Sequence, residues 1–191
     1  YPSNPSRVNE AIITGGFRVQ GDSVTITGLT ILDGVGPAGI GDITAIHMAS
    51  DTTGHLIKNN IITGADASGS RGIVSSSPSG TFNVINNDFS GWTTGLYINP
   101  GSNNVFVDAN NFHDNVVGLS ADDATKLIVE NSFFTNNSFE HIGLGGGNGV
   151  IIRENSFDAN SPSVSNYGTL NVNASNNWWG TTDLALITSN L

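Results

Sequence analysis

Two adjacent carboxylates and a lysine lie within the short segment ADDATK. They are Asp122, Asp123 and Lys126. A pair of carboxyl groups is what glycoside hydrolases use to cleave glycosidic bonds. Glycoside hydrolases place two carboxyl groups roughly 5–9.5 Å apart across the bond. Adjacent aspartates in a turn are poorly spaced for two opposed roles. The sequence therefore does not assemble a catalytic set here, and a non-catalytic protein is favoured over an enzyme.

Acidic residues also raise the question of a cation site. Asp122 and Asp123 offer oxygen ligands in a turn, as Ca²⁺ prefers, but they lack the spacing of an established calcium loop. Glu130 and Glu154 each precede an asparagine of a repeated motif, so we predict that they stack on adjacent turns. There the like charges would favour a shared cation. The favoured alternative is that the nearby basic side chains Lys126 and Arg153 neutralise the two glutamates without a metal. Calcium is therefore a possible cofactor, and the sequence does not require any cofactor.

Exposed aromatic side chains suggest a different chemistry, the binding of sugars. The apolar faces of sugar rings pack on aromatic surfaces. Tyr97, on an outward strand position, and Trp92, in a turn, are the candidates. Asn99, Asp122 and His47 would be polar neighbours on the same predicted sheet. We therefore expect any glycan to lie on this face.

Composition excludes several other classes of function. The chain of 191 residues has 16 acidic and six basic residues and a net charge of −10, which disfavours binding to nucleic acid. No apolar run reaches the length that spans a membrane, so membrane insertion is not expected. The absence of cysteine excludes disulfides and thiolate metal sites. The four histidines show no metal-ligand spacing and are interpreted as surface residues: His47, His55, His113 and His141.

These candidate residues are set within a repeat. The motif apolar-x-x-Asn-x-apolar recurs at spacings of 27, 23, 21 and 24 residues, which is typical of a solenoid. Its asparagines are Asn60, Asn87, Asn110, Asn131 and Asn155. Each repeat contains short runs of alternating apolar and polar residues, separated by Gly and Asn clusters. The sequence therefore predicts an all-β fold, a parallel β-helix of about seven coils.

Stacked coils place equivalent residues directly above one another. We predict that the motif asparagines form an internal amide ladder, because Asn tolerates left-handed bends and carries both donor and acceptor. An inward stack should follow two residues later: Ile62, Phe89, Phe112, Phe133 and Phe157. A second inward column should be Ile46, Ile73, Leu96 and Leu119. Its outward neighbours should be His47, Val74, Tyr97 and Ser120.

The organisation expected is a single β-helix domain. Residues 1–23 form an amino-terminal cap region, residues 24–179 form the coils, and residues 180–191 begin a carboxyl-terminal extension. In the first coil, Leu29 stands where the ladder asparagine would be, which is typical of a capping coil. The chain begins at Tyr1, and we expect it to be a processed product or part of a longer protein.

The Asn-x-Phe coil and the closing segment NNWWGTTD (176–183) resemble right-handed parallel β-helix repeats, the pectate-lyase-like family of secreted carbohydrate-active and surface proteins. The resemblance implies a right-handed, single-stranded helix and an extracellular or cell-surface location. It implies a polysaccharide partner and, for a lyase, a basic residue beside calcium-holding carboxylates, for which only Lys126 is near enough.

We expect a non-catalytic module that binds carbohydrate or acts as a rigid adhesive or structural element. One alternative is a polysaccharide lyase or glycoside hydrolase acting on an acidic polysaccharide with Asp122, Asp123 and Lys126 at its site. Another is a structural subunit that self-associates through its coil ends, since a β-helix exposes strand edges unless they are capped.

Overall fold

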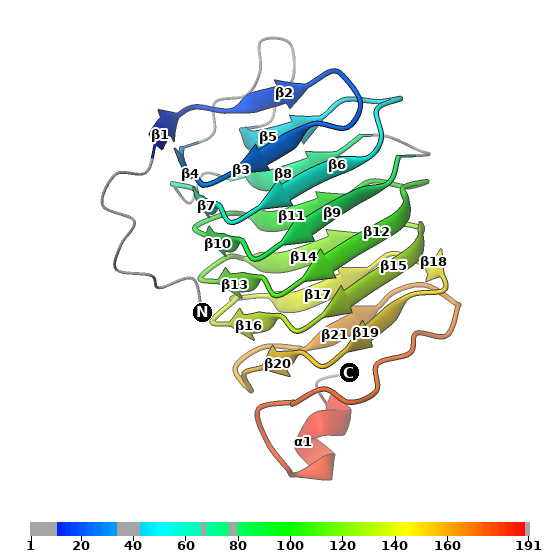
Figure 1. The fold of residues 1–191 in the computed structure, drawn as a ribbon. Helices are drawn as coiled ribbons and strands as arrows, with labels where there is room; N and C mark the ends of the chain where they lie inside the picture. The colour runs from blue at the N-terminus through cyan, green and yellow to red at the C-terminus, as the bar shows by residue number, and fades with distance from the viewer. Residues whose placement is uncertain (1–10, 34–42, 66–67, 77–79, 190–191) are drawn as a thin grey trace.

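Three parallel sheets wind around one common axis in this computed structural model, which describes residues 11–33, 43–65, 68–76 and 80–189 (Figure 1). Sheet A contains β1 (Ala11–Thr14), β4 (Leu29–Leu32), β7 (Ile61–Thr63), β10 (Asp88–Ser90), β13 (Asn111–His113), β16 (Phe133–Thr135) and β20 (Ser156–Phe157). Sheet B contains β2 (Phe17–Val19), β5 (Thr44–Met48), β8 (Arg71–Ser75), β11 (Thr94–Ile98), β14 (Val117–Ala121), β17 (Glu140–Leu144) and β21 (Val164–Asn166). Sheet C contains β3 (Thr25–Thr27), β6 (His55–Lys58), β9 (Phe82–Ile85), β12 (Asn103–Asp108), β15 (Ala124–Glu130), β18 (Gly147–Asn148) and β19 (Ile151–Arg153).

Each turn of the helix contributes one strand to sheet B, then to sheet C, then to sheet A. The turns stack in sequence order, and α1 (Leu184–Ser189) lies beyond the last turn (Figure 1). The predicted parallel β-helix is therefore confirmed. Sheets A and B have seven strands each. The predicted count of about seven coils is nevertheless too high, because β1 and β21 belong to incomplete turns at the two ends. Among the described residues, no helix is both long and apolar enough to cross a bilayer.

The inward column predicted for sheet B is present. Ile46 pairs with Ile73, Ile73 with Leu96, and Leu96 with Leu119, and all four side chains are fully buried. The column continues to Ile142 on β17. Alternation of apolar and polar residues with period two thus assigns one face of each strand to the core.

An internal ladder of amides joins sheet C to sheet A, as predicted for Asn60, Asn87, Asn110 and Asn155. The Nδ2 of Asn60 donates to Asn87 Oδ1 over 3.0 Å, and Asn87 Nδ2 donates to Asn110 Oδ1 over 3.1 Å. The same oxygens accept backbone N–H groups from the turn before. Each ladder residue is at least 98% buried, so these bonds satisfy polar groups that water cannot reach.

The assignment of Asn131 to the ladder is wrong. Asn131 is exposed, and Ser132 takes the ladder position, where its Oγ accepts the Asn110 N–H and its own N–H donates to Asn155 Oδ1. The physical reason is that the bend uses two residues with separate tasks. The first adopts a left-handed backbone and the second points inward. Asn131, with φ of 51°, performs the first task, as do Asn59, Asn86, Ala109, Glu154 and Asn176 in the other turns.

The same offset corrects the aromatic stack. Phe134, not Phe133, lies between Phe112 and Phe157, with ring centroids 4.9 and 5.2 Å away. Phe133 is 41% exposed on the outside of sheet A. Phe89 stacks on Phe112 at 4.7 Å, and the column ends where Trp179 covers Phe157 at 5.1 Å. Parallel stacking of identical rings follows from the register of the turns, because each strand repeats the one below it.

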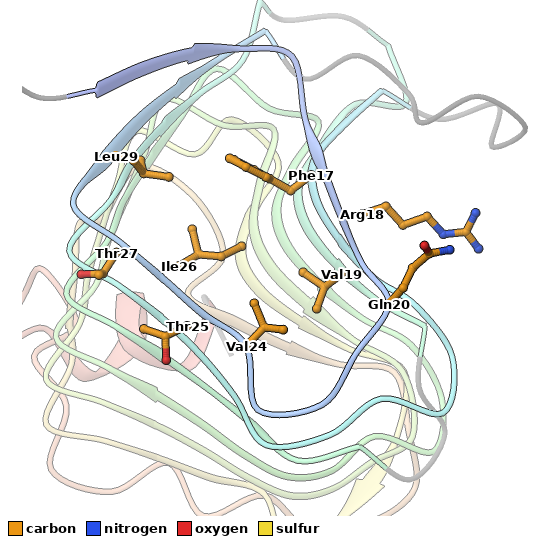
Figure 2. Close-up of a pocket in the computed structure, with 9 residues that line it drawn as sticks. All are labelled: Phe17, Arg18, Val19, Gln20, Val24, Thr25, Ile26, Thr27 and Leu29. Carbon is orange, nitrogen blue, oxygen red and sulfur yellow. The ribbon is translucent and has the colours of Figure 1, made fainter.

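The amino-terminal end of the described helix is hollow. Figure 2 shows Phe17, Val19, Val24, Ile26 and Leu29 pointing into the first turn, around a cavity of about 450 Å³. Leu29 occupies the ladder position, as predicted for a capping coil, and its N–H donates to Asn60 Oδ1. The predicted cap region 1–23 extends partly outside the described residues. An apolar residue here ends the ladder without leaving an inward amide unpaired.

We predict that Asn110→Ala lowers the free energy of unfolding by at least about 2 kcal/mol. The substitution leaves the Asn87 N–H and the Val84 carbonyl without their buried partner, and each such group costs about 1–3 kcal/mol. Urea unfolding monitored by circular dichroism would measure the change. Asn148→Ala, at an exposed position on β18, is the control and should change stability by less than about 0.5 kcal/mol. Equal losses in the two variants would refute the ladder.

Candidate functional site

The outer face of sheet B carries the predicted cluster of polar and aromatic residues. His47 pairs with Val74, Val74 with Tyr97, and Tyr97 with Ser120, so the outward column predicted from the sequence is present. Asn99 and Asp122 follow on the next outward positions of adjacent turns. The parallel register therefore brings Tyr97, Asn99, Asp122 and Ser120 to one surface.

Tyr97 is held from two sides. Its hydroxyl donates to Asp122 Oδ2 over 2.7 Å, and the Arg71 guanidinium lies 4.7 Å from the ring centroid. Burial raises the pKa of the Tyr97 hydroxyl, and the hydrogen bond to Asp122 raises it further. A cation over an aromatic face is attracted by the ring quadrupole. Because Arg71 already covers one face of the ring, Tyr97 offers less stacking surface than the sequence suggested.

The polar neighbours of Tyr97 contribute unequally. Asn99 Nδ2 donates to the Ser75 carbonyl, which fixes the amide to the backbone of the previous turn. His47 is only 7% exposed, and its Nε2 lies 2.8 Å from Ser76 Oγ. Burial lowers the pKa of His47, and the charge of Arg18 lowers it further. Asp122 keeps one carboxylate oxygen beyond its bond to Tyr97 and is the most available of these groups.

Trp92 does not lie on the surface, and its assignment to the sugar site is wrong. The side chain is 1% exposed, and its Nε1 donates to the Ile62 carbonyl over 2.9 Å. Asn115 and Asn137 make the equivalent bonds to carbonyls in the following turns. Trp92 is thus a member of a second internal ladder at the corner between sheets A and B. Its indole N–H replaces the amide donor, and the ring fills the core beside Gly64.

Two residues of the same face were missed by sequence reasoning. Glu140 begins β17 and Tyr167 follows β21, and the Tyr167 hydroxyl donates to Glu140 Oε2 over 2.8 Å. This bond raises the pKa of the Tyr167 hydroxyl. Tyr167 is 66% exposed and is therefore the aromatic ring of this face that is free to stack. The alternating pattern of SVSNYG, with Val164 buried, was the available signal.

Small residues form the floor between the two tyrosines. Ser120 pairs with Gly143, and Gly145 follows Asp122 in the next turn. A Cβ at Gly143 would overlap Glu140 Oε1, and one at Gly145 would overlap Asp122 Oδ1. The glycines therefore leave room for two carboxylates that lie over the strand. Both carboxylates therefore lie against neighbouring glycines on one face of the helix.

The other predicted catalytic residues lie away from this pair. Asp123 follows Asp122 in the corner, with φ of 45°, and its carboxylate lies against Gly146. Lys126 lies on β15 of sheet C and lines a separate cavity there. The set of Asp122, Asp123 and Lys126 is thus divided between two faces, because the chain turns the corner from sheet B to sheet C at Asp123.

The predicted stacking of Glu130 on Glu154 is also wrong. Glu130 pairs with Arg153, whose Nη2 lies 2.7 Å from Glu130 Oε2, and Glu154 is the left-handed residue of its bend. The one-residue offset that affects Asn131 is again the cause. Across the described ranges, no three His, Cys, Asp or Glu side chains gather in a way that could hold a metal ion.

The histidines are less exposed than the sequence suggested. His55 and His141 are at least 98% buried, and His47 nearly so. Asn137 Nδ2 lies 3.0 Å from His141 Nδ1, and His141 Nε2 lies 3.0 Å from Asp158 Oδ1. Because an amide nitrogen can only donate, the proton of the neutral ring is on Nε2 and is donated to Asp158. Burial lowers the pKa of His141, and the group has a structural role at the corner between sheets A and B.

His113 lies on the outer face of sheet A between two carboxylates. Its Nε2 is 2.7 Å from Asp88 Oδ1, and its Nδ1 is 2.7 Å from Asp114 Oδ2. The hydrogen bond to Asp88 is the largest cause that raises the pKa of His113, and the bond to Asp114 raises it further. Burial lowers the pKa by less, so the result is a pKa of about 9. His113 is therefore an imidazolium at neutral pH and ties two turns of the sheet together.

Comparison with known families agrees with this architecture. The family described as "Right handed beta helix region" matches residues 15–179, which is most of the chain. The chain belongs to this family. Comparison with curated proteins found no match, and comparison with solved structures found none. Membership of the right-handed β-helix family establishes the fold and leaves function to be argued from the side chains.

We predict that stability falls as the pH rises through about 9, because His113 then loses its proton. The folded pKa exceeds the unfolded value of about 6.5, so the stabilisation is fully present below pH 6.5 and is lost above pH 9. Urea unfolding from pH 6 to 10 would measure this. His113→Gln keeps a hydrogen-bonding side chain but cannot ionise, and its profile should be flatter. Identical profiles would show that His113 does not carry the dependence.

Proposed function

We propose that the outer face of sheet B binds a neutral glycan chain, and that the protein is a non-catalytic carbohydrate-binding module. The observation that carries the proposal is the exposed ring of Tyr167, held by Glu140 beside a floor of small residues. A ring that is fixed in place loses little freedom when a sugar packs on it. The floor of Ser120, Gly143 and Gly145 leaves the approach to that ring open along the strand direction.

The charges of this face favour a neutral sugar over a uronic acid. Asp122 and Glu140 each accept one tyrosine hydroxyl, and a carboxylate has capacity for further donors. Sugar hydroxyl groups can supply them at Asp122, which is partly exposed, whereas Glu140 is only 5% exposed and serves chiefly to hold Tyr167. A uronate would meet two like charges there. Of the described basic residues on this face, Arg71 already lies over Tyr97, and Arg18 lies in the first turn beside His47. The net charge of −10 adds to this repulsion.

We place this activity in an extracellular or cell-surface setting and in a larger protein. The acidic, Lys-poor and Asn/Ser/Thr-rich composition supports the extracellular setting, as does the resemblance of the coils to those of secreted pectate-lyase-like proteins. A β-helix provides a rigid rod on which one sheet can be presented to a polysaccharide. In this setting the module would attach its parent protein to a glycan surface.

Tyr167→Ala should weaken the binding of a neutral oligosaccharide by about 1–2 kcal/mol, because stacking and buried area are lost. A glycan array of neutral and uronic oligosaccharides would first identify the ligand, and isothermal titration calorimetry would measure its Kd. Phe133→Ala is the matched control, since it truncates an exposed aromatic side chain on sheet A. Unchanged affinity in Tyr167→Ala, or preference for uronic chains, would contradict the proposal.

A specific observation supports hydrolysis as a second candidate function. Asp122 Oδ1 and Glu140 Oε1 lie against Gly145 and Gly143 on one face, and glycoside hydrolases act with a pair of carboxyl groups. In this scheme one carboxyl group protonates the leaving oxygen while the other activates water. Glu140 thus replaces Asp123 as the partner of Asp122.

If this candidate is correct, the protein releases reducing ends from a neutral glycan, and both Asp122→Asn and Glu140→Gln reduce the rate by at least about a hundredfold. Each variant should retain binding, because amides still accept sugar hydroxyls. A reducing-sugar assay with and without calcium would measure the rate. If the wild-type protein releases no reducing ends from any glycan that it binds, hydrolysis is excluded and the non-catalytic function is retained.

A further inference from the structure

A cavity of about 320 Å³ lies on the outer face of sheet C, away from the face described above. Its floor consists of Phe106, Ile128 and Ile151, which stack in register on three successive turns. Each side chain is only partly buried. Apolar residues scattered singly over a surface are normal, whereas contiguous ones mark a site of interaction, so three adjacent apolar side chains distinguish this part of the sheet. A volume of about 300 Å³ or more is typical of small-molecule pockets.

The rim of this cavity is built by a repeated distortion of the strand. Asn104, Lys126 and Gly149 occupy equivalent positions on three turns and all have positive φ, at 53°, 56° and 72°. A left-handed residue within a strand bends the chain locally. The bend recurs in the same place because the turns are in register, and it raises a wall beside the apolar floor. The wall therefore comes from the backbone, whereas the floor comes from side chains.

Lys126 belongs to this wall, and its side chain is exposed. Within the residues that the structure describes, no carboxylate forms an ion pair with Lys126. The acids of the neighbouring column have other partners. Asp108 accepts a hydrogen bond from Asn131, and Glu130 binds Arg153. The chain has a net charge of −10, yet this lysine has no acidic partner in the described part of the chain. A ligand with a carboxylate could form an ion pair with Lys126 and pack its apolar part on the floor.

We propose that this cavity binds a small amphiphilic carboxylate, whose ring or chain packs on Phe106, Ile128 and Ile151 while its carboxylate pairs with Lys126. The floor matches an apolar group in size and character, and the lysine supplies the only charge among the lining residues. An uncharged apolar ligand would leave the ammonium group without a partner, and a phosphate or other hydrophilic anion would not use the floor. The site is independent of the glycan face on sheet B.

The test is a titration with 3-phenylpropionate, followed by heteronuclear NMR of the isotope-labelled protein. Shifts should be confined to the amides of the cavity residues and absent from sheet B around Tyr97 and Tyr167. The neutral isostere 3-phenylpropionamide should bind about tenfold more weakly, since it lacks the charged contact. Equal affinity for acid and amide, or shifts centred on sheet B, would overturn the proposal.

Two variants separate the contributions of charge and floor. Lys126→Met keeps the apolar stem and should weaken 3-phenylpropionate about tenfold while leaving 3-phenylpropionamide unchanged. Lys58→Met removes a lysine from the outer face of the same sheet and should alter neither ligand. Phe106→Ala should weaken both ligands. If Lys126→Met and Lys58→Met bind the acid alike, Lys126 is not part of a site. Glycan binding by each variant would be measured in parallel and should persist.

Discussion

Inward hydrogen bonding between amide side chains of successive turns is the interaction on which the other features depend. The side-chain oxygens of Asn87 and Asn110 each accept both a backbone N–H and a side-chain N–H from the turn before. A slip of one residue would move these groups to the outside and leave buried donors unpaired. The ladder thus fixes the register of every turn. Stacked phenylalanines, the buried columns of sheet B and the two surface sites all inherit their alignment from it.

Much of the fold could be predicted because the same types of residue recur at equivalent positions of successive repeats. The asparagines at 60, 87, 110 and 155 are inward, polar and regularly spaced, and few structures other than a solenoid satisfy that combination. The turn at VENSFFTNN was misread for a physical reason. An asparagine there satisfies the left-handed bend, and the serine that follows does the inward hydrogen bonding. Sequence alone does not show which of two polar neighbours points inward.

The candidate site was predicted as a face but not as a set of residues. Period-two alternation correctly placed Tyr97, Asn99 and Asp122 on one surface. It could not show that Arg71 covers the Tyr97 ring or that the indole of Trp92 bonds inward to a carbonyl. Tyr167 follows the end of β21, well before the ladder asparagine of its turn, Asn177, so the repeated motif does not point to it. Which side chains meet depends on how far each one extends toward the neighbouring turn, and this length and direction cannot be read from the order of residues along the chain.

Ser132 has a consequence for how the rod holds together. Its hydroxyl accepts the Asn110 N–H, but the Asn110 amide nitrogen turns to the Val84 and Asp108 carbonyls instead. The amide-to-amide hydrogen bonds that join Asn60, Asn87 and Asn110 are thereby separated from the one that joins Asn155 and Asn177. In a solenoid, where each repeat is stabilised chiefly by its neighbours, cooperativity is passed along such chains. At Ser132 the ladder passes between turns through backbone N–H donors alone, while the Phe112–Phe134 stack and the bond from Asn115 to Asn137 continue across the same turns. The three columns therefore cover for one another, and a break in one of them does not interrupt the rod.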